Sequence, residues 1–159
     1  MKLNPKRREG NMKAIQLLTE DHNKVTGLFD EYEATDDINR KKEIAEKVFM
    51  ELEVHSKIEE EIFYPAVRSK TDEEGKSLIS ESMEEHQRVK DLIQELRGLD
   101  LENDEFDDKF DELMDNVEHH VDEEESEVFP KAEEYFSNEL DRLGSEMENR
   151  KEQLMTSPR

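Results

Sequence analysis

The chain has 159 residues, a length that suits one compact domain, and its formal net charge of −22 argues against duplex DNA or an anionic membrane surface as a partner. Cysteine is absent, which excludes disulfides, thiolate metal sites and cysteine nucleophiles. No apolar run approaches the length of a membrane span or of a signal-peptide core, so we expect a cytoplasmic location.

Helical periodicity organises most of the chain. Residues 1–11 carry basic side chains around a proline and a glycine and are predicted to be a flexible lead-in. From residue 12 the apolar residues recur at alternating steps of three and four, which is typical of one face of a helix. Such stripes cover residues 15–32, 45–66, 79–96 and 106–127, and loops are predicted at 69–76 and 98–104.

A further stripe over residues 140–154 predicts a fifth helix. We therefore predict an all-α fold, with an up-down-up-down four-helix bundle over residues 12–136. An amphipathic C-terminal helix and a frayed end follow over residues 137–159. The C-terminal helix is expected to pack on the bundle, or on a second copy of the chain in a homodimer.

The bundle is predicted to consist of two copies of one helix pair. A shift of 64 residues overlays the first helix on the third, so that His22 coincides with His86. A shift of 65 residues overlays the second helix on the fourth, and it pairs His55 with His120 and Glu59 with Glu124. Neither helix pair is thick enough to bury its own apolar stripe, so the two copies are expected to pack together.

Six ionisable residues lie on the inward stripes, where burial without partners is costly. They are His22, His55, Glu59, His86, His120 and Glu124. For any one of them, a hydrogen-bonded core residue or a misjudged register is the simpler interpretation. As a repeated set, four imidazoles and two carboxylates favour a metal centre within the bundle over a polar core without metal. The fifth histidine, His119, has no counterpart and is expected to be exposed or to lie behind the ligands.

These residues resemble the motifs of hemerythrin-like proteins with the HHE cation-binding domain. The shared motifs are Glu20-Asp21-His22, His55 to Glu60 running into Phe63-Tyr64-Pro65, Glu85-His86, and His120 to Glu125 running into Val128-Phe129-Pro130. The resemblance implies a non-haem centre of two iron ions, bridged by carboxylates and by an oxo or hydroxo group. It assigns one iron to His22 and His55, the other to His86 and His120, and the bridges to Glu59 and Glu124.

The sequence departs from the oxygen-carrying members of that family at one position. Those proteins have a further histidine one turn after the ligand of the third helix, where this chain has Lys90. We expect Lys90 to turn outward and to leave an open position on the iron held by His86 and His120. Glu127 and Glu51 are alternative ligands that could fill the gap, and the simpler interpretation of each is a solvated flank residue.

Three functions remain open from the sequence. The first is a di-iron protein that binds or reacts with dioxygen, peroxide or nitric oxide in stress defence or iron handling, as an oxidoreductase if it turns over. The second is an iron or oxygen sensing module without turnover. The third is an acidic helical interaction protein without metal.

Overall fold

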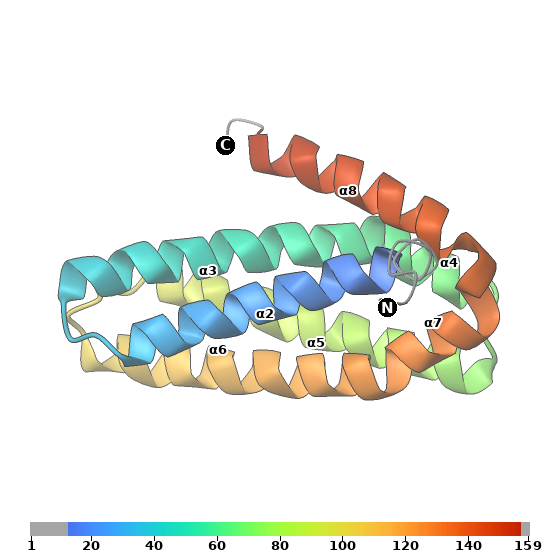
Figure 1. Cartoon of the computed structure of the whole chain (residues 1–159). Helices are drawn as coiled ribbons and strands as arrows, with labels where there is room; N and C mark the ends of the chain where they lie inside the picture. The colour runs from blue at the N-terminus through green and yellow to red at the C-terminus, as the bar shows by residue number, and fades with distance from the viewer. Residues whose placement is uncertain (1–12, 157–159) are drawn as a thin grey trace, which may run out of the picture.

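The computed structural model describes residues 13–156, and it confirms the predicted all-α bundle (Figure 1). The four long helices are α2 (Lys13–Glu33), α3 (Ile38–Ile58), α5 (Glu73–Arg97) and α6 (Asp104–Glu123). Successive long helices run in opposite directions, and no strand occurs within residues 13–156. The predicted lead-in at 1–11, the first residue of the predicted bundle and the frayed end at 157–159 lie outside the described residues.

Two of the predicted helices each contain a π-helical turn. The turn η1 (Glu59–Phe63) joins α3 to α4 (Tyr64–Arg68), and η2 (Glu124–Val128) joins α6 to α7 (Phe129–Phe136). In each turn the backbone N–H donates to the carbonyl five residues earlier, from Tyr64 to Glu59 and from Phe129 to Glu124. A π turn makes room for the proline that follows, and it adds one residue between neighbours on the same helix face.

The loop predicted at residues 69–76 is shorter than expected, because α5 begins at Glu73. Asp72 caps the helix by accepting a hydrogen bond from the Gly75 backbone N–H at 2.8 Å. Gly75 therefore lies in the first helical turn rather than in the loop. Its lack of a side chain serves packing, since a Cβ there would lie 1.9 Å from Thr71 Oγ1.

The C-terminal helix α8 (Leu140–Thr156) follows a short 3-10 turn, η3 (Ser137–Glu139), and lies across α2 and α3. Leu140, Leu143 and Met147 are buried in the same apolar cluster as the start of α2. At Gly144 a Cβ would approach the Ala14 backbone nitrogen to 2.7 Å, so this close crossing requires glycine. The inner side of α8 is thus used within the molecule, and a homodimer through this helix stays a prediction.

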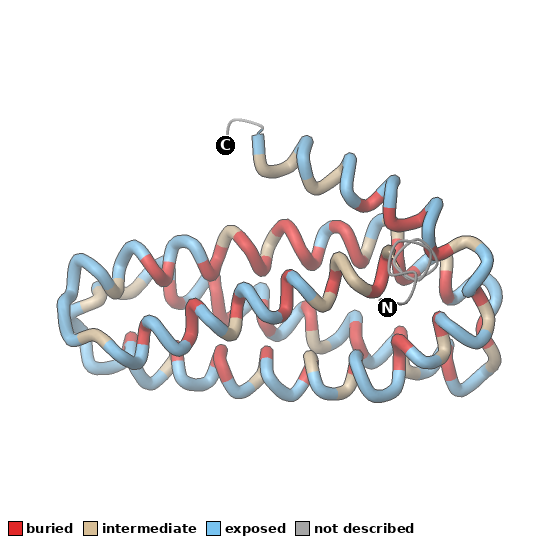
Figure 2. The backbone as a smooth tube through the Cα atoms, in the orientation of Figure 1, coloured by how far each residue is buried: buried red, intermediate tan, exposed pale blue. Residues whose placement is uncertain are grey.

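Buried residues follow the inner faces of the helices (Figure 2) and form two apolar clusters, one toward each end of the bundle. On α2, Leu18 belongs to one cluster and Val25 to the other, with His22 between them. The polar residues predicted for the site therefore lie in a layer between two apolar cores. None of the helices in residues 13–156 combines the length and apolar character needed to cross a membrane.

Candidate metal centre

The six residues singled out from the sequence are all buried and lie together in this middle layer. Each of the four long helices contributes one histidine, and each π turn contributes the glutamate with which it begins. Their donor atoms form two groups that share Glu59, and within a group all donor atoms lie within 4.8 Å of one another. The groups are His22, His55, Glu59 and Glu124 for the first, and Glu59, His86 and His120 for the second.

The first group contains four buried polar atoms that make no hydrogen bond within the described part of the chain. They are His22 Nε2, His55 Nε2, Glu59 Oε2 and Glu124 Oε1. His22 Nε2 lies 3.1 Å from Glu124 Oε1, and His55 Nε2 lies 3.4 Å from Glu59 Oε2. Buried polar atoms are normally hydrogen-bonded, so four of them that lie close together without a hydrogen bond fit a bound cation.

The other oxygens of Glu59 and Glu124 face the histidines of the second group. Glu59 Oε1 lies 2.9 Å from His86 Nε2 and 3.9 Å from His120 Nε2. Glu124 Oε2 lies 3.7 Å from His120 Nε2. Each carboxylate therefore directs one oxygen toward each pair of histidines, which is the arrangement that a bridging ligand needs.

Tyr64 is a residue of this centre that the sequence analysis missed. Its hydroxyl donates to Glu124 Oε2 at 2.5 Å, and it lies 3.0 Å from Glu59 Oε1. The same oxygen lies 3.2 Å from His86 Nε2 and 3.4 Å from His120 Nε2. The phenol oxygen thus lies inside the second group, where it is an additional oxygen donor for a cation.

The first group has no matching hydroxyl, because the repeat shift of 65 residues pairs Tyr64 with Phe129. The ring of Phe129 stacks on His22, with 5.9 Å between ring centroids and an interplanar angle of 5°. The two halves of the centre are therefore chemically different despite the shared fold of the two helix pairs.

Each of the four histidines contacts a carboxylate on the side away from the centre. Its Nδ1 contacts one carboxylate oxygen while Nε2 points into the centre. The pairs are His22–Glu125 at 2.8 Å, His55–Asp21 at 2.9 Å, His86–Glu60 at 2.7 Å and His120–Glu85 at 2.6 Å. Such carboxylates fix the ring orientation and make Nε2 a better donor, which is the usual arrangement behind metal-bound histidines.

These supporting carboxylates follow the internal repeat. Asp21 and Glu85 precede the histidines of the first and third helices and each bind the histidine of the next helix. Glu60 and Glu125 follow Glu59 and Glu124 and contact the histidines of α5 and α2. A search of the sequence for acidic residues duplicated at the shifts of 64 and 65 would have found all four.

The carboxylates govern protonation of the metal-free cluster. Burial alone would lower the pKa of His55, but the charges of Glu59 and Asp21 outweigh it and raise that pKa to about 10. Burial is also outweighed at His120, whose pKa lies well above its usual value beside Glu124, Glu59 and Glu85. The pKa of Glu59 is lowered well below its usual value by the surrounding imidazoles, against the effect of burial. A bound cation would take the place of these protons.

The three further residues considered from the sequence do not reach the donor groups. Lys90 turns outward, and its Nζ pairs with Glu60 Oε1 at 2.9 Å. Glu51 is buried but pairs with Lys24 at 2.9 Å, which draws its carboxylate away from the histidines. Glu127 is exposed, because the η2 turn changes the helical phase after Glu124. The structure therefore gives no support to Glu51 or Glu127 as ligands.

His119 is 70% exposed and lies on the outer side of the centre. Its Nε2 is 3.7 Å from Glu85 Oε2, so it stands behind the carboxylate that supports His120. Glu123 completes this surface group, and burial together with the adjacent Glu85 charge raises the pKa of Glu123 to about 7. His119 thus contacts Glu85, which in turn contacts His120, and it does not itself reach the donor atoms.

A small cavity adjoins the centre. It measures about 30 Å³ and is bounded by the four histidines of the two donor groups. The remaining wall is mainly apolar and includes Val25, Leu52, Val89, Val117 and Val121. This volume matches one or two water-sized groups, so a diatomic or peroxide molecule fits and a larger organic substrate does not.

Comparison with known proteins gives three matches. The family model described as "Hemerythrin HHE cation binding domain" matches residues 13–132. A curated protein named DNA nickase, from Nostoc sp. strain PCC 7120, is 31% identical over 129 residues, which are 81% of this chain and 36% of that protein. The chain thus spans about a third of the length of this relative.

The third match is the crystal structure of a hemerythrin HHE cation-binding domain-containing protein from Mycobacterium kansasii. It superposes with a TM-score of 0.76 at 27% sequence identity, covering 89% of this chain and 86% of the other.

Proposed function

The chain belongs to the hemerythrin HHE cation-binding family, and we propose that its centre holds two iron ions and binds or reacts with dioxygen, peroxide or nitric oxide. The observation that supports this proposal is the set of four buried donor atoms in the first group that make no hydrogen bond within the described residues. They face each other in two His–Glu contacts of 3.1 and 3.4 Å, whereas a polar core that folds without metal would be expected to join such atoms by hydrogen bonds.

The donor chemistry supports iron at both positions. His22, His55, Glu59 and Glu124 would hold one ion, and Glu59, Glu124, His86, His120 and the Tyr64 oxygen would hold the other. Imidazole, carboxylate and phenol donors suit iron. Bound iron would supply a redox-active Lewis acid for small oxygen and nitrogen ligands.

The residues around the centre orient the histidines and exclude bulk water and larger molecules. The carboxylates behind the histidines keep each Nε2 directed inward. The valines around the cavity of about 30 Å³ limit the ligand to a few atoms and keep bulk water out. Size selection of this kind favours dioxygen, nitric oxide or peroxide over organic substrates.

Metal content and optical response test the proposal together. Protein made in iron-replete cells and reconstituted anaerobically should hold about two iron ions per chain, since the donors form two groups. Its visible spectrum should change when dioxygen, peroxide or nitric oxide is added. Less than about half an iron per chain, the level of adventitious binding, would refute the proposal and favour a metal-free interaction protein.

A second candidate, a sensor without turnover, is supported by a contact of α8. Lys151 on this helix lies 2.5 Å from Asp21 Oδ1, and the other Asp21 oxygen supports His55 at 2.9 Å. A change at His55 on iron loss would therefore reach α8 through one carboxylate. Hydrogen exchange of α8 with and without iron tests coupling, and steady-state consumption of peroxide or nitric oxide distinguishes an enzyme from a sensor.

The match to the DNA nickase gives no support for DNA cleavage by this chain. The matched region is 36% of that protein, and the net charge of −22 opposes approach to DNA. Gel-shift measurements at low salt should detect no DNA binding.

A further inference from the structure

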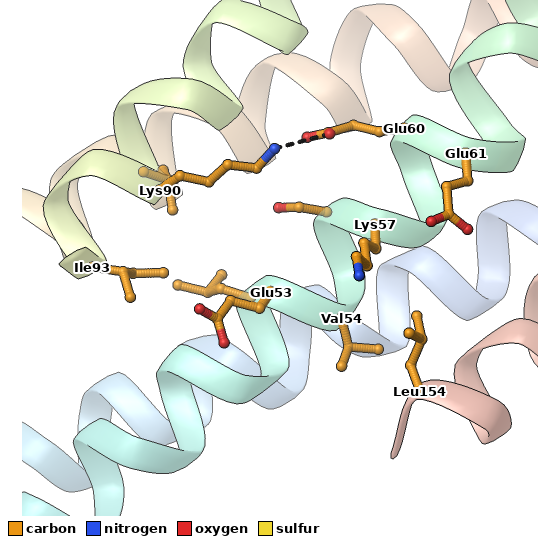
Figure 3. A pocket seen from close by; sticks show the side chains of 11 residues that line it. Glu53, Val54, Lys57, Glu60, Glu61, Lys90, Ile93 and Leu154 are labelled. Atoms are coloured by element: carbon orange, nitrogen blue, oxygen red, sulfur yellow. Dashed lines mark hydrogen bonds and ion pairs between the residues drawn. The ribbon is translucent and has the colours of Figure 1, made fainter. Parts of the chain in front are cut away.

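A pocket of about 690 Å³ opens between α3, α5 and the last turns of α8, and we call it the vestibule. Val54 from α3, Ile93 from α5 and Leu154 from α8 line its apolar part (Figure 3). Lys90 reaches toward Glu60 on one side of it, with the ion pair drawn as a dashed line. The charged residues around the vestibule are Glu53, Lys57, Glu60, Glu61 and Lys90.

The vestibule and the small cavity beside the histidines have three lining residues in common. These residues are Leu52 and Ser56 from α3 and Val89 from α5, and we call them the partition. All three are buried, at 7% exposure each. Because the same side chains face both spaces, the partition is one layer of side chains thick.

We propose that the vestibule is the entrance through which small neutral ligands reach the metal centre, and that the partition is the gate they cross. This inference rests on the proposed function, since it supposes that the centre binds such ligands. Two of the three gate residues are aliphatic, so they oppose the passage of ions and hydrated molecules. Dioxygen, nitric oxide and hydrogen peroxide carry no charge and are small enough to pass when the partition side chains change rotamer.

Another surface pocket provides a matched control. It measures about 330 Å³, includes Tyr64 and Met83 in its wall, and thus also adjoins the centre. It has no lining residue in common with the small cavity. Blocking this second pocket should therefore leave ligand access unchanged.

The absence of cysteine allows each pocket to be blocked separately. Leu154→Cys places one thiol in the vestibule, and Met83→Cys places one in the control pocket, where Met83 is 39% exposed. Each variant is loaded with iron, and half of it is labelled with a bulky maleimide. Nitric oxide is then mixed with the reduced protein, and the rate and final amplitude of the spectral change are recorded with the iron content.

We expect the label at position 154 to slow nitric oxide binding about tenfold, because the remaining paths need rarer openings of the bundle. The final spectrum and iron content should stay unchanged, and the label at position 83 should have no effect on the rate. Val89→Ala thins the gate and should accelerate binding in the unlabelled protein. This variant gives an independent readout if the label distorts α8.

The outcomes separate the entrance from the function on which it rests. Equal rates with and without the label at position 154, in protein that holds iron and responds to nitric oxide, overturn the entrance alone. Equal slowing by both labels also overturns it, since access would not depend on the vestibule. If the unlabelled protein holds no iron, or if its spectrum does not change with nitric oxide, the proposed function is refuted. The proposed entrance is then refuted as well.

Discussion

Replacing Tyr64 with phenylalanine removes one oxygen from the middle of the centre and leaves the ring in place. That oxygen contacts Glu124 Oε2 at 2.5 Å and Glu59 Oε1 at 3.0 Å, and Tyr64 is 2% exposed. Burial and the two nearby carboxylates raise the pKa of the Tyr64 hydroxyl well above its usual value. In the metal-free protein the hydroxyl therefore stays protonated and donates to a buried charge.

Tyr64→Phe should lower stability because it removes this one hydrogen-bond donor. One hydrogen bond to a charged group contributes about 1.5–3 kcal/mol, and its loss leaves a buried carboxylate oxygen without a donor. For a chain of this length, a loss of about 2 kcal/mol corresponds to a fall in Tm of roughly 4–8 °C. We expect the metal-free Tyr64→Phe variant to melt lower by about this amount.

Iron-loaded protein gives the second readout. A phenol that binds iron as phenolate produces a strong visible absorption, which Tyr64→Phe should abolish while the imidazole and carboxylate ligands remain. Calorimetry of the metal-free protein and visible spectra of the loaded protein measure the two effects. Tyr32→Phe is the matched control, because the Tyr32 hydroxyl donates to Asp107 at 2.6 Å in a different layer of the bundle.

The control variant should lose stability without any change in iron content or spectrum. If Tyr64→Phe leaves both the metal-free Tm and the loaded spectrum unchanged, the hydroxyl does not lie among the ligand atoms, and our description of the second donor group is wrong.

Three further predictions concern metal, folding and pH. Glu59→Gln or Glu124→Gln should weaken iron binding at least about tenfold. Glu51→Gln should not weaken it, because Glu51 pairs with Lys24. Equal iron loss in all three variants would contradict the proposed bridging roles of Glu59 and Glu124. Chelation of the iron should lower Tm by several degrees, and added iron should restore it. The reason is that a ligand at about 100 times its Kd stabilises the fold by about 2.7 kcal/mol. The same Tm with and without iron would argue against a metal site coupled to folding. Lys131 and the Gly75 backbone N–H lower the pKa of Asp72 to about 2. The ionised Asp72 carboxylate therefore contributes fully to stability above about pH 4, and this contribution disappears as the pH falls toward 2. Urea unfolding of Asp72→Asn should therefore show a deficit against the parent protein at pH 7 that is absent near pH 2, and a deficit that persists in acid would contradict this assignment.

The bundle and the six residues of its centre could be predicted because both depend on patterns that are local in the sequence. The apolar period gives the four helices, and the duplication brings His22 and His86 to equivalent depths even when either one alone is ambiguous. The repeat thus supplies evidence of the kind that conservation would otherwise provide. It also explains why the inward positions predicted for the six residues agree with their burial in the structure.

The positions of Tyr64, Glu51 and Glu127 depend on changes of helical phase and on tertiary contacts, which the sequence pattern does not show. A π turn adds one residue, so Glu127 turns outward and Tyr64, five residues after Glu59, turns inward. The pairing of Glu51 with Lys24 joins two helices and leaves no trace in the sequence pattern. Proline at the end of both inward stripes was the available signal for the altered phase, but by itself it predicts a helix end as readily as a π turn.

Tyr64 also changes which half of the centre should accept an external ligand. Lys90 in place of a histidine suggested an open position on the iron held by His86 and His120. The Tyr64 oxygen lies within 3.4 Å of both of those Nε2 atoms and fills the space that a missing nitrogen would leave. On the other side the equivalent residue is Phe129, which offers no donor atom to His22. In the proposed centre, the half with His22 and His55 would therefore have fewer protein ligands.

This asymmetry leads to a prediction opposite to the one from the sequence. Phe129→Tyr adds an oxygen to the half with His22 and His55 at the position equivalent to the Tyr64 hydroxyl. It should weaken nitric oxide binding with iron content unchanged, because the added oxygen competes for the same position. Lys90→His should have little effect, since Lys90 pairs with Glu60 on the outer side and the inner position is already filled by Tyr64. Equilibrium titration of both reduced, iron-loaded variants with nitric oxide measures the difference. A large change in Lys90→His with none in Phe129→Tyr would return the open position to the half with His86 and His120.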